Sequence, residues 1–480
     1  MKKLAIISIA ALGLGACTKN IEGYNQQTKA AAEVPAPSLY SNAVRSLTDA
    51  ITSSNVNTNV YRLVVQHWTT TTYTDEPNYD FFTRNIPQRW WTIMYKDVLA
   101  DLKECKRLIP GQVGVTASVK TNQTAIADII EVYTWSILVS TYGNVPYSKA
   151  LDINNLFPEY DDAAKIYSDL LTRLDADIAA LNTAEKGFDS NQDLVYGGGA
   201  FPNQTDQWAK FANSLKIRMA MLIADVDNTK AKTAIEAADA KAFASAGDNA
   251  IFKYASATPN NNPIWADLVQ SKRQDFIGSS TMIDKLNQLS DPRLKQYFRP
   301  NDNSVYVGGI NGSTNTFALF AKASTKMVAI DFPSVLLDYA ETEFYRAEAK
   351  ERGYNVTGTA EDHYKNAIRA SIKYWGGTDA DADTYLLRPD VAYTTAAGTW
   401  KQKIGTQKWL AMYNRGFEAW TEVRRLDFPV LAPPTAPKSG FPTRFTYPTN
   451  EQTLNNKNYT AAAAAIGGDK VDVKLFWDKN

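Results

Sequence analysis

Aromatic side chains stand beside amide, carboxylate and guanidinium side chains in three stretches of this sequence. The candidate ligand-binding residues in these stretches are Tyr73, Asp75, Asn78, Tyr79, Trp265, Arg273 and Tyr306. A sugar ring buries its C–H face against an aromatic ring, and its hydroxyl groups need hydrogen-bond partners such as Asn, Asp and Arg. Burying about 50 Å² of ring face contributes roughly 1–2 kcal/mol. Two or three stacks therefore predict weak, reversible binding of oligosaccharides.

Residues that usually carry catalysis are scarce. The two histidines, His67 and His363, are predicted to be structural, the second on an exposed position of a helix. A Gly-x-Ser-x-Gly motif is absent, and the glycines at 197–199 fit no phosphate-binding loop. Asp161 and Asp162 suit the N-terminus of a helix better than a pair of glycosidase carboxylates. With only two Cys and two His, we expect no metal site, no cofactor and no enzyme activity.

The composition describes a globular protein with balanced charge. Its 480 residues include 51 Lys and Arg against 51 Asp and Glu, and 44% of the residues are hydrophobic. Such a chain can bury a large core, but it lacks the basic field that nucleic-acid binding requires. Nucleic acid is therefore not an expected partner.

The first residues have the order of a secretory signal. Two lysines precede an apolar run from Leu4 to Leu14, which is too short to span a bilayer, and Gly15-Ala16-Cys17 follows. Leu14 to Cys17 resembles the lipobox of bacterial lipoproteins, in which cleavage precedes a Cys that becomes lipidated; an ordinary signal cut elsewhere is the alternative. We expect a signal peptide at 1–16, a lipidated Cys17 that begins a flexible tether at 17–37, and a binding domain at 38–480. The other thiol, Cys105, lies on an apolar helix face and is predicted to be core.

Helical periodicity dominates the rest of the chain. Apolar residues recur every three or four positions, and Pro110 and Gly143 mark helix ends. Helices are predicted at 91–109, 126–137, 161–181, 206–225, 332–352, 361–375 and 401–424. Evidence for strands is limited to short patches at 304–307 and 445–447.

The stretch 335–375 suggests how these helices pair. Small residues such as Ala340 and Ala347, and aromatic residues such as Tyr339 and Tyr364, occur at the spacing of paired helices in a tetratricopeptide (TPR) solenoid. The sequence therefore predicts an all-α, TPR-like scaffold of helix pairs, with long loop insertions and at most minor β-hairpins.

The long insertions are predicted to carry function, because extended stretches without regular structure are otherwise rare in compact domains. They lie at 53–59, 73–85, 258–263, 299–317 and 376–399. Phe81, Phe82 and Trp265 have an alternative role as apolar plugs beneath their own loops.

Several motifs, taken in order, resemble the SusD/RagB-like family of outer-membrane nutrient-binding lipoproteins. They are the lipobox, Thr141–Tyr147, Tyr160-Asp161, Asp193–Gly198, Trp208–Arg218, Asp291–Leu294, Glu341–Ala349 with Arg352-Gly353, Gln407–Leu410, Glu418–Trp420 with Arg424-Arg425, and Arg444–Pro448. The similarity spans nearly the whole chain after Cys17. Most of these residues are expected to serve the scaffold, with Arg218 and Arg424 paired to carboxylates and Gly143 and Gly353 ending helices.

This resemblance implies a role outside the cell. Such proteins are anchored in the outer membrane by the acylated Cys, face the cell exterior, and pass oligosaccharides to a partner TonB-dependent transporter of the SusC type. Three alternatives remain open from the sequence: the same role with peptides as ligands, a TPR-type scaffold that binds only proteins, and a hydrolase.

Overall fold

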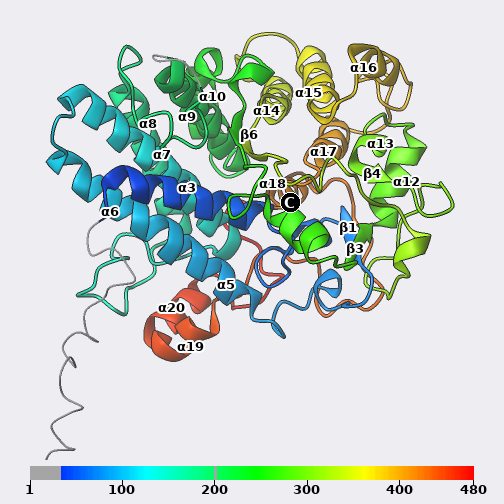
Figure 1. Cartoon of the computed structure of the whole chain (residues 1–480), viewed down its shortest axis with the longest axis horizontal. Coiled ribbons are helices and arrows are strands. Elements are labelled where there is room, and N and C mark those ends of the chain that lie inside the picture. Colours follow the sequence, from blue (N-terminus) through cyan, green and yellow to red (C-terminus); the bar gives the residue numbers. More distant parts are fainter. Residues whose placement is uncertain (1–33, 199–202, 480) are drawn as a thin grey trace, which may run out of the picture.

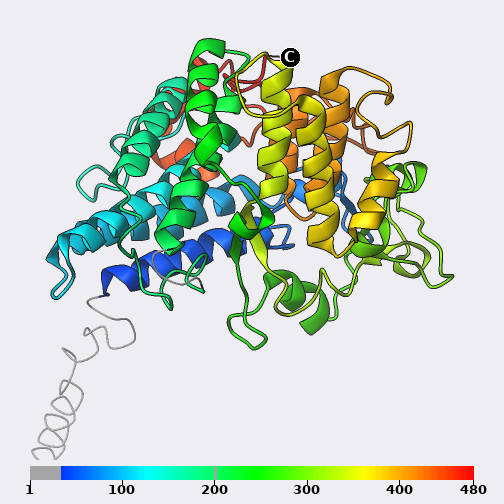
Figure 2. The ribbon, with the colours of Figure 1, turned by 90° about the horizontal axis from the view of Figure 1, so that it is seen from above.

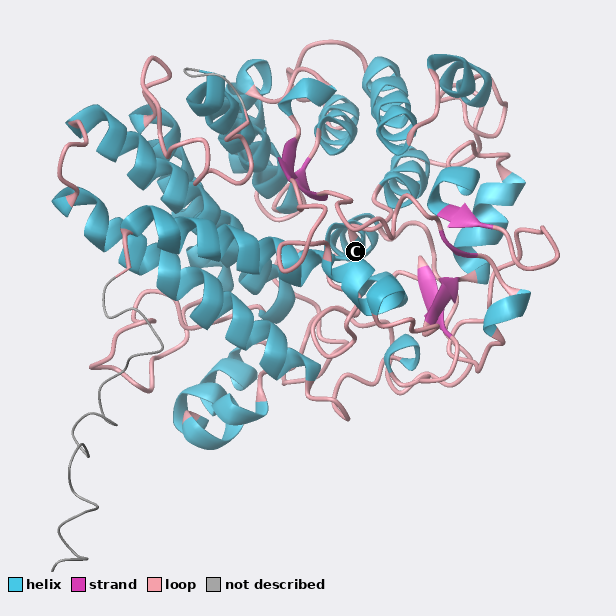
Figure 3. Ribbon diagram, in the orientation of Figure 1, coloured by secondary structure: helices cyan, strands magenta, loops and turns pink. Residues whose placement is uncertain are grey.

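The computed structural model describes residues 34–198 and 203–479. The predicted signal peptide, Cys17 and most of the predicted tether lie outside the described residues. Helices make up most of the molecule, and strands are few and short (Figure 1, Figure 3). The predicted all-α fold with minor β-hairpins is therefore confirmed. No helix in the described ranges has the length and apolar character needed to cross a membrane.

The first half of the domain is built mainly from helices, several of which are long and pack against one another. These are α3 (Ala36–Thr52), α4 (Tyr61–Val64), α5 (Ile86–Thr92), α6 (Ala100–Leu108), α7 (Ala117–Tyr142), α8 (Ala163–Ala180), α9 (Asn203–Leu222) and α10 (Asn228–Ala238). Helix α3 packs along α6, α7 along α8, and α9 along α10. Because α3 begins at Ala36, regular structure starts two residues before the predicted domain boundary.

The second half contains further helix pairs and the shorter helices near the loops. These are α11 (Pro263–Trp265), α12 (Ser280–Gln288), α13 (Leu294–Tyr297), α14 (Tyr339–Glu351), α15 (Ala360–Trp375), α16 (Asp379–Leu386), α17 (Trp400–Ala411), α18 (Gly416–Leu426), α19 (Thr449–Leu454) and α20 (Asn456–Ala465). In Figure 2, α14 and α15 run side by side as the two yellow helices. The predicted helix pairing at 335–375 is thus present.

Two predicted helices differ in detail from those observed. The helix predicted at 91–109 is present without a break, as α5, a π-helical segment η2 (Ile93–Leu99) and α6 in direct succession. The helix predicted at 401–424 is instead two helices, α17 and α18. Between them Asn414 adopts a left-handed backbone conformation, with φ of 69°, which an α-helix cannot continue through. The Asn414 side chain also accepts a hydrogen bond from Arg62 Nε at 2.9 Å.

The helix predicted at 332–352 begins later than expected. Residues Ser334–Leu337 form strand β6, and α14 starts only after Asp338. The Asp338 carboxylate accepts a hydrogen bond from Glu341 N at 2.8 Å and so caps the helix. Similar caps support the scaffold elsewhere: Asp162 caps α8, and Gly143 and Gly353 have φ of 86° and 76° at helix ends, as predicted.

Three two-stranded antiparallel sheets join distant parts of the chain. They pair β1 (Trp68–Thr70) with β3 (Phe276–Gly278), β2 (Ala250–Phe252) with β6 (Ser334–Leu337), and β4 (Phe298–Arg299) with β5 (Lys322–Ala323). The predicted strand positions at 304–307 and 445–447 were wrong. Phe445 instead stacks on Tyr61, with 5.3 Å between ring centroids, and belongs to the aromatic core.

Buried charges, rather than apolar contacts alone, tie the helix pairs together. Arg218 on α9 forms a 2.7 Å ion pair with Glu341 on α14, and Arg425 on α18 binds Glu348 of α14 at 2.5 Å. The carboxylate partner predicted for Arg218 is confirmed. The prediction for Arg424 was wrong, because its guanidinium donates to the carbonyl oxygens of Ser140 and Thr443 at 2.8 and 2.7 Å.

Three further predictions concern small or titratable side chains. Cys105 is fully buried, as predicted, and burial raises the pKa of its thiol to about 12. His67 is fully buried, with Nε2 3.1 Å from the Trp409 carbonyl oxygen. The exposed position predicted for His363 was wrong, because its Nδ1 lies 2.9 Å from Glu343 and the side chain is buried. The loop 355–359 covers the face of α15 that periodicity alone assigns to solvent.

Candidate ligand-binding site

A pocket that is partly open to solvent brings two of the predicted ligand-binding residues together. It is lined by Ser54, Asn55, Val56, Asn57, Thr70, Tyr73, Glu76, Arg84, Asp267, Leu268, Arg273, Asp275 and Phe276. We call it the Tyr73 pocket. Its residues come from three segments of the chain. Two of these segments overlap the insertions at 53–59 and 73–85, which were predicted to carry function.

Pairing of strands β1 and β3 creates this pocket. Thr70 lies opposite Phe276 in the antiparallel register, and Thr71 N donates to the Asp275 carbonyl oxygen at 2.9 Å. Tyr73 lies three residues after β1 and Arg273 lies three residues before β3, so the pairing places both at the same end of the sheet. Residues that are 200 positions apart in sequence thereby line one cavity.

The loop before α4 supplies the amide groups. Asn55 Oδ1 accepts a hydrogen bond from Asn57 N at 3.0 Å and holds the turn. Ser54 Oγ donates to Asp267 Oδ2 at 2.9 Å, which ties this loop to the segment after α11. Burial raises the pKa of Asp267, although the hydrogen bond from Ser54 opposes that shift. Asn55, Asn57 and Asp267 thus present amide and carboxyl groups to one side of the pocket.

Tyr73 is the exposed aromatic ring of the pocket, with 52% of its surface accessible. The Arg84 guanidinium carbon lies 5.2 Å from the ring centroid, which is cation–π distance. Arg84 also forms a close ion pair with the buried Glu76, so its own position is fixed. Burial raises the pKa of Glu76 despite this pair. Tyr73 is therefore a supported platform rather than a free loop side chain.

Arg273 also lines the pocket, from the segment that precedes β3. Its Nε lies 2.6 Å from Asp275, and its side chain is 53% exposed. Phe276, next to Asp275, is half-buried against Trp68 at a centroid distance of 5.6 Å and provides an apolar wall. The pocket thus combines an aromatic platform, an apolar wall, two amides, and both acidic and basic groups.

The other predicted ligand-binding residues lie outside this cavity lining. Asn78 and Tyr79 are buried, and Asn78 Nδ2 donates to the Thr74 and Gly312 carbonyl oxygens at 2.8 Å each. Asp75 precedes the short helix η1 (Glu76–Asn78) and is half-buried. Asn78 and Tyr79 therefore hold the loop in place and present no free polar group to a ligand in this conformation.

Trp265 and Tyr306 are also separate from the pocket lining. Trp265 is half-buried on α11, two residues before Asp267. Tyr306 is half-buried on the 299–317 loop, and its carbonyl oxygen accepts a hydrogen bond from Asn287 Nδ2 at 3.2 Å. Of the three rings with a possible role as plugs, Phe81 is buried, whereas Phe82 is 82% exposed.

Sequence reasoning did not select eight of the polar residues that line the pocket. Asn55, Asn57, Arg84 and Asp267 are four of these eight. Asn55 and Asn57 lie in the Asn-rich insertion at 53–59, so the composition of that insertion could have identified them. Nothing local marks Asp267, because its role depends on the contact between its segment and Ser54. Among the described residues, no group of three or more Asp, Glu, His or Cys side chains could hold a metal ion.

Comparison with known proteins identifies the family of this chain. A family model for SusD-like proteins, described as starch-binding and associating with the outer membrane, matches residues 26–448. No curated protein sequence matches significantly.

Solved structures agree over almost the whole chain. A structure described as a chitin-binding protein is 26% identical, with a TM-score of 0.78 and with 93% of this chain and 100% of that chain covered. A SusD homologue from Bacteroides uniformis is 26% identical, with a TM-score of 0.75 and coverage of 92% and 99%. A chitin-binding SusD homologue from Flavobacterium johnsoniae, 24% identical with a TM-score of 0.77 and coverage of 92% and 99%, supports the fold. The chain therefore belongs to the SusD-like family.

Proposed function

We propose that this protein is a non-enzymatic cell-surface lipoprotein that binds oligosaccharides in the Tyr73 pocket and delivers them to a SusC-like, TonB-dependent outer-membrane transporter. The observation that carries the proposal is the supported Tyr73 ring, which stands beside Asn55, Asn57, Asp267 and Arg273 in one open cavity. The family description and two chitin-binding relatives support a glycan as the ligand.

The pocket can bind a sugar by two complementary contacts. A pyranose ring would stack on the exposed part of Tyr73 and lose water from its C–H face. Its hydroxyl groups would exchange hydrogen bonds with the Asn55 and Asn57 amides, the Asp267 carboxyl and the Arg273 guanidinium. A single main aromatic platform gives weak binding, which allows the ligand to be released to a transporter.

We expect Tyr73→Ala to weaken oligosaccharide binding about tenfold, because one ring stack contributes roughly 1–2 kcal/mol. Arg273→Ala should weaken binding by a similar factor by removing charged hydrogen-bond donors. Isothermal titration calorimetry with malto- and chito-oligosaccharides measures both effects. Phe82→Ala is the matched control, since Phe82 is an exposed aromatic of the same loop that does not line the pocket. Equal affinity of the Tyr73→Ala, Phe82→Ala and unsubstituted proteins would reject the site.

The same titrations separate the alternative ligands and activities. Heat of binding with peptide pools but not with glycans would reassign the ligand to peptides. Binding of neither class would favour a scaffold for protein partners. The pocket also holds Glu76, Asp267 and Asp275, so incubation with labelled glycans tests hydrolysis, and release of shorter products would replace the binding role with an enzymatic one.

We further propose the arrangement of the N-terminal part: a signal peptide at 1–16, a lipidated Cys17 and tether at 17–37, and the binding domain at 38–480. Two or more acyl chains hold a protein on a membrane almost irreversibly. Cys17→Ala should therefore move the protein from the outer-membrane fraction to the soluble fraction of fractionated cells. Retention of the Cys17→Ala protein in the membrane would contradict the anchor.

A further inference from the structure

A second, wider groove of about 950 Å³ lies elsewhere in the fold. It is bounded by the segment 244–251 on one side and by helices α14 and α15 on the other, and it shares no lining residue with the Tyr73 pocket. Its side chains with polar groups include Asn249, Tyr339, Asn366, Arg369, Lys373 and Tyr374. Three alanines, Ala244, Ala246 and Ala370, also line it. We call it the Tyr339 groove.

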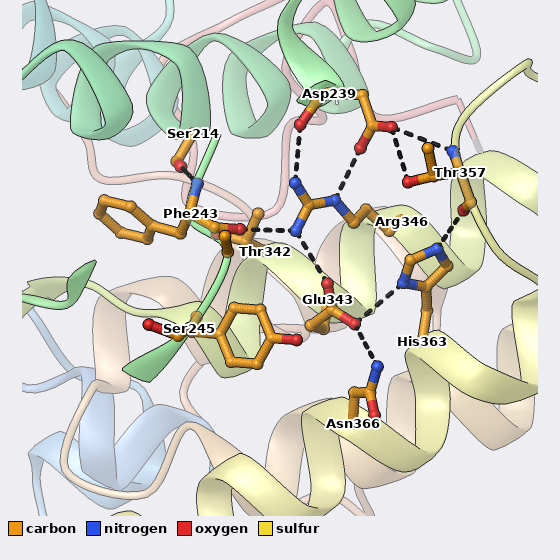
Figure 4. Close-up of polar contacts among 12 residues, drawn as sticks. Ser214, Asp239, Phe243, Ser245, Thr342, Glu343, Arg346, Thr357, His363 and Asn366 are labelled. Carbon is orange, nitrogen blue, oxygen red and sulfur yellow. Dashed lines mark hydrogen bonds and ion pairs between the residues drawn. The ribbon is translucent and has the colours of Figure 1, made fainter. Parts of the chain in front are cut away.

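A buried carboxylate holds one polar side chain of the Tyr339 groove in place. Glu343 is 2% exposed and accepts hydrogen bonds from Asn366 Nδ2 at 3.0 Å and from Arg346 Nη1 at 2.8 Å (Figure 4). It also lies 2.9 Å from His363 Nδ1. The groove residue Asn366 is therefore anchored below the surface.

A further layer of contacts holds that anchor. Arg346 donates to Asp239 at 2.7 Å and to the Phe243 carbonyl oxygen at 2.7 Å, and Asp239 accepts a hydrogen bond from Thr357 N at 3.0 Å (Figure 4). On the opposite wall, Asn249 Oδ1 accepts a hydrogen bond from Tyr339 N at 2.7 Å. These contacts join η4 (Asp239–Lys241), α14, α15 and the 355–359 loop. The walls of the groove are thus set before any ligand arrives, which lowers the entropic cost of binding.

The chemistry of the groove fits a flat, polar ring. Two tyrosines and two asparagines line it, and Arg369 and Lys373 stand one turn apart on its rim. Arg369 lies 2.5 Å from Asp383, and Lys373 lies 2.8 Å from Asp379, so the rim is nearly neutral. A neutral saccharide can use the aromatic faces and the amide groups together.

We propose that the Tyr339 groove is a second saccharide-binding site, for neutral oligosaccharide segments. The choice of a saccharide as ligand rests on the proposed function. The groove itself is formed by residues that do not line the Tyr73 pocket. Two sites on one chain make the second contact with a long polymer intramolecular, which raises its apparent affinity without any new kind of contact. Polysaccharide is then held more tightly than a short oligosaccharide of the same sugar.

The test uses the full-length protein with the Tyr73 pocket disabled by Tyr73→Ala and Arg273→Ala. A glycan array identifies the best neutral oligosaccharide for the unsubstituted protein, and calorimetry with that oligosaccharide follows. We expect the disabled protein to keep residual binding, and Ala370→Trp in the same background to abolish it by filling the groove. The matched control is Ala380→Trp, a substitution of the same kind on α16, outside the groove.

Hydrogen exchange supplies an independent measurement that does not depend on a substitution. Glycan should protect the 244–251 segment and α15 in the Tyr73-disabled protein. With the unsubstituted protein, retention of soluble polysaccharide should fall at least about tenfold on Ala370→Trp alone.

Three outcomes are distinguishable. Complete loss of glycan binding in the Tyr73-disabled protein, without protection of 244–251, would overturn the second site and leave the proposed function intact. Binding of peptides but not glycans in the groove would also overturn it. Failure of the unsubstituted protein to bind any glycan on the array would overturn both proposals together.

Discussion

Glu341→Gln is expected to lower the free energy of unfolding by about 3–5 kcal/mol, the range seen when one partner of a buried ion pair is removed. Glu341 is 2% exposed and receives hydrogen bonds from Arg218 Nε and Nη2, each at 2.7 Å. Arg415 forms a second, very close pair with the same carboxylate. The substitution leaves two buried guanidinium groups without their shared counter-charge.

The charge state of Glu341 supports this expectation. Burial alone would raise the pKa of its carboxyl, but Arg218 and Arg415 outweigh burial and hold the pKa at about 2. The carboxylate is therefore ionised in the folded protein across the physiological range. Glutamine keeps the shape of the side chain but not its charge. The loss of stability therefore measures the lost electrostatic interaction and not the effect of a cavity.

Urea denaturation at neutral pH measures the effect. Glu361→Gln is the control, because Glu361 pairs with Lys365 on the surface of α15, where both side chains are 35% and 42% exposed. Exposed pairs of this kind contribute about 0.5 kcal/mol or less. A loss below about 1 kcal/mol for Glu341→Gln would show that the buried network is not needed to hold α9, α14 and α18 together.

Acidification from pH 7.5 to pH 5 is expected to remove roughly 2 kcal/mol of stability through His67 alone. Burial lowers the pKa of the His67 imidazole to about 3, although the hydrogen bond with the Trp409 carbonyl oxygen opposes the shift. In the unfolded chain the imidazole binds a proton near its ordinary pKa of about 6.5. The unfolded state therefore binds more protons below that pH, and stability falls by about 1.4 kcal/mol for each further pH unit until the folded pKa is reached.

His363 should act in the opposite direction. Burial would lower the pKa of its imidazole, but the hydrogen bond and charge of Glu343 outweigh burial and raise it. Its contribution to stability is therefore fully present below the ordinary histidine pKa, and it is lost as the pH rises through the folded value. The only two histidines of the chain thus oppose each other across the same pH range.

Urea denaturation at a series of pH values separates the two contributions. His67→Gln should flatten the fall in stability below pH 6.5, and His363→Gln should make it steeper. An unchanged slope for the His67→Gln protein would show that His67 does not remain neutral in the folded state.

Local sequence determined much of the scaffold. Periodicity placed α8, α9 and α15 within a few residues of their observed bounds, because an apolar stripe repeats within each helix and needs no distant partner. Glycines at 143 and 353 ended helices for the same local reason, a backbone with positive φ. The break at Asn414 could not be predicted from periodicity, since its side chain is held by Arg62, which lies 352 positions earlier.

The candidate site was predicted only in part. Loop composition predicted Tyr73 and Arg273 and singled out the insertion that contains Asn55 and Asn57. The ability of an aromatic ring to stack and of an amide to form hydrogen bonds depends on the residue type, so it can be read from the sequence. Composition also selected Asn78 and Tyr79, which the fold uses inside the loop.

Tertiary structure alone decided which of these groups meet. The pairing of Thr70 with Phe276 brings together segments that local periodicity treats as unrelated. The burial of His363 and its contact with Glu343 likewise depend on the packing of α15 against α14, and Arg346 of α14 binds Asp239, which lies 107 positions earlier. Sequence patterns reflect interactions between residues that are a few turns of helix apart. A binding site is formed by contacts between distant segments, and the number of residues between two segments does not indicate how close they lie in the fold.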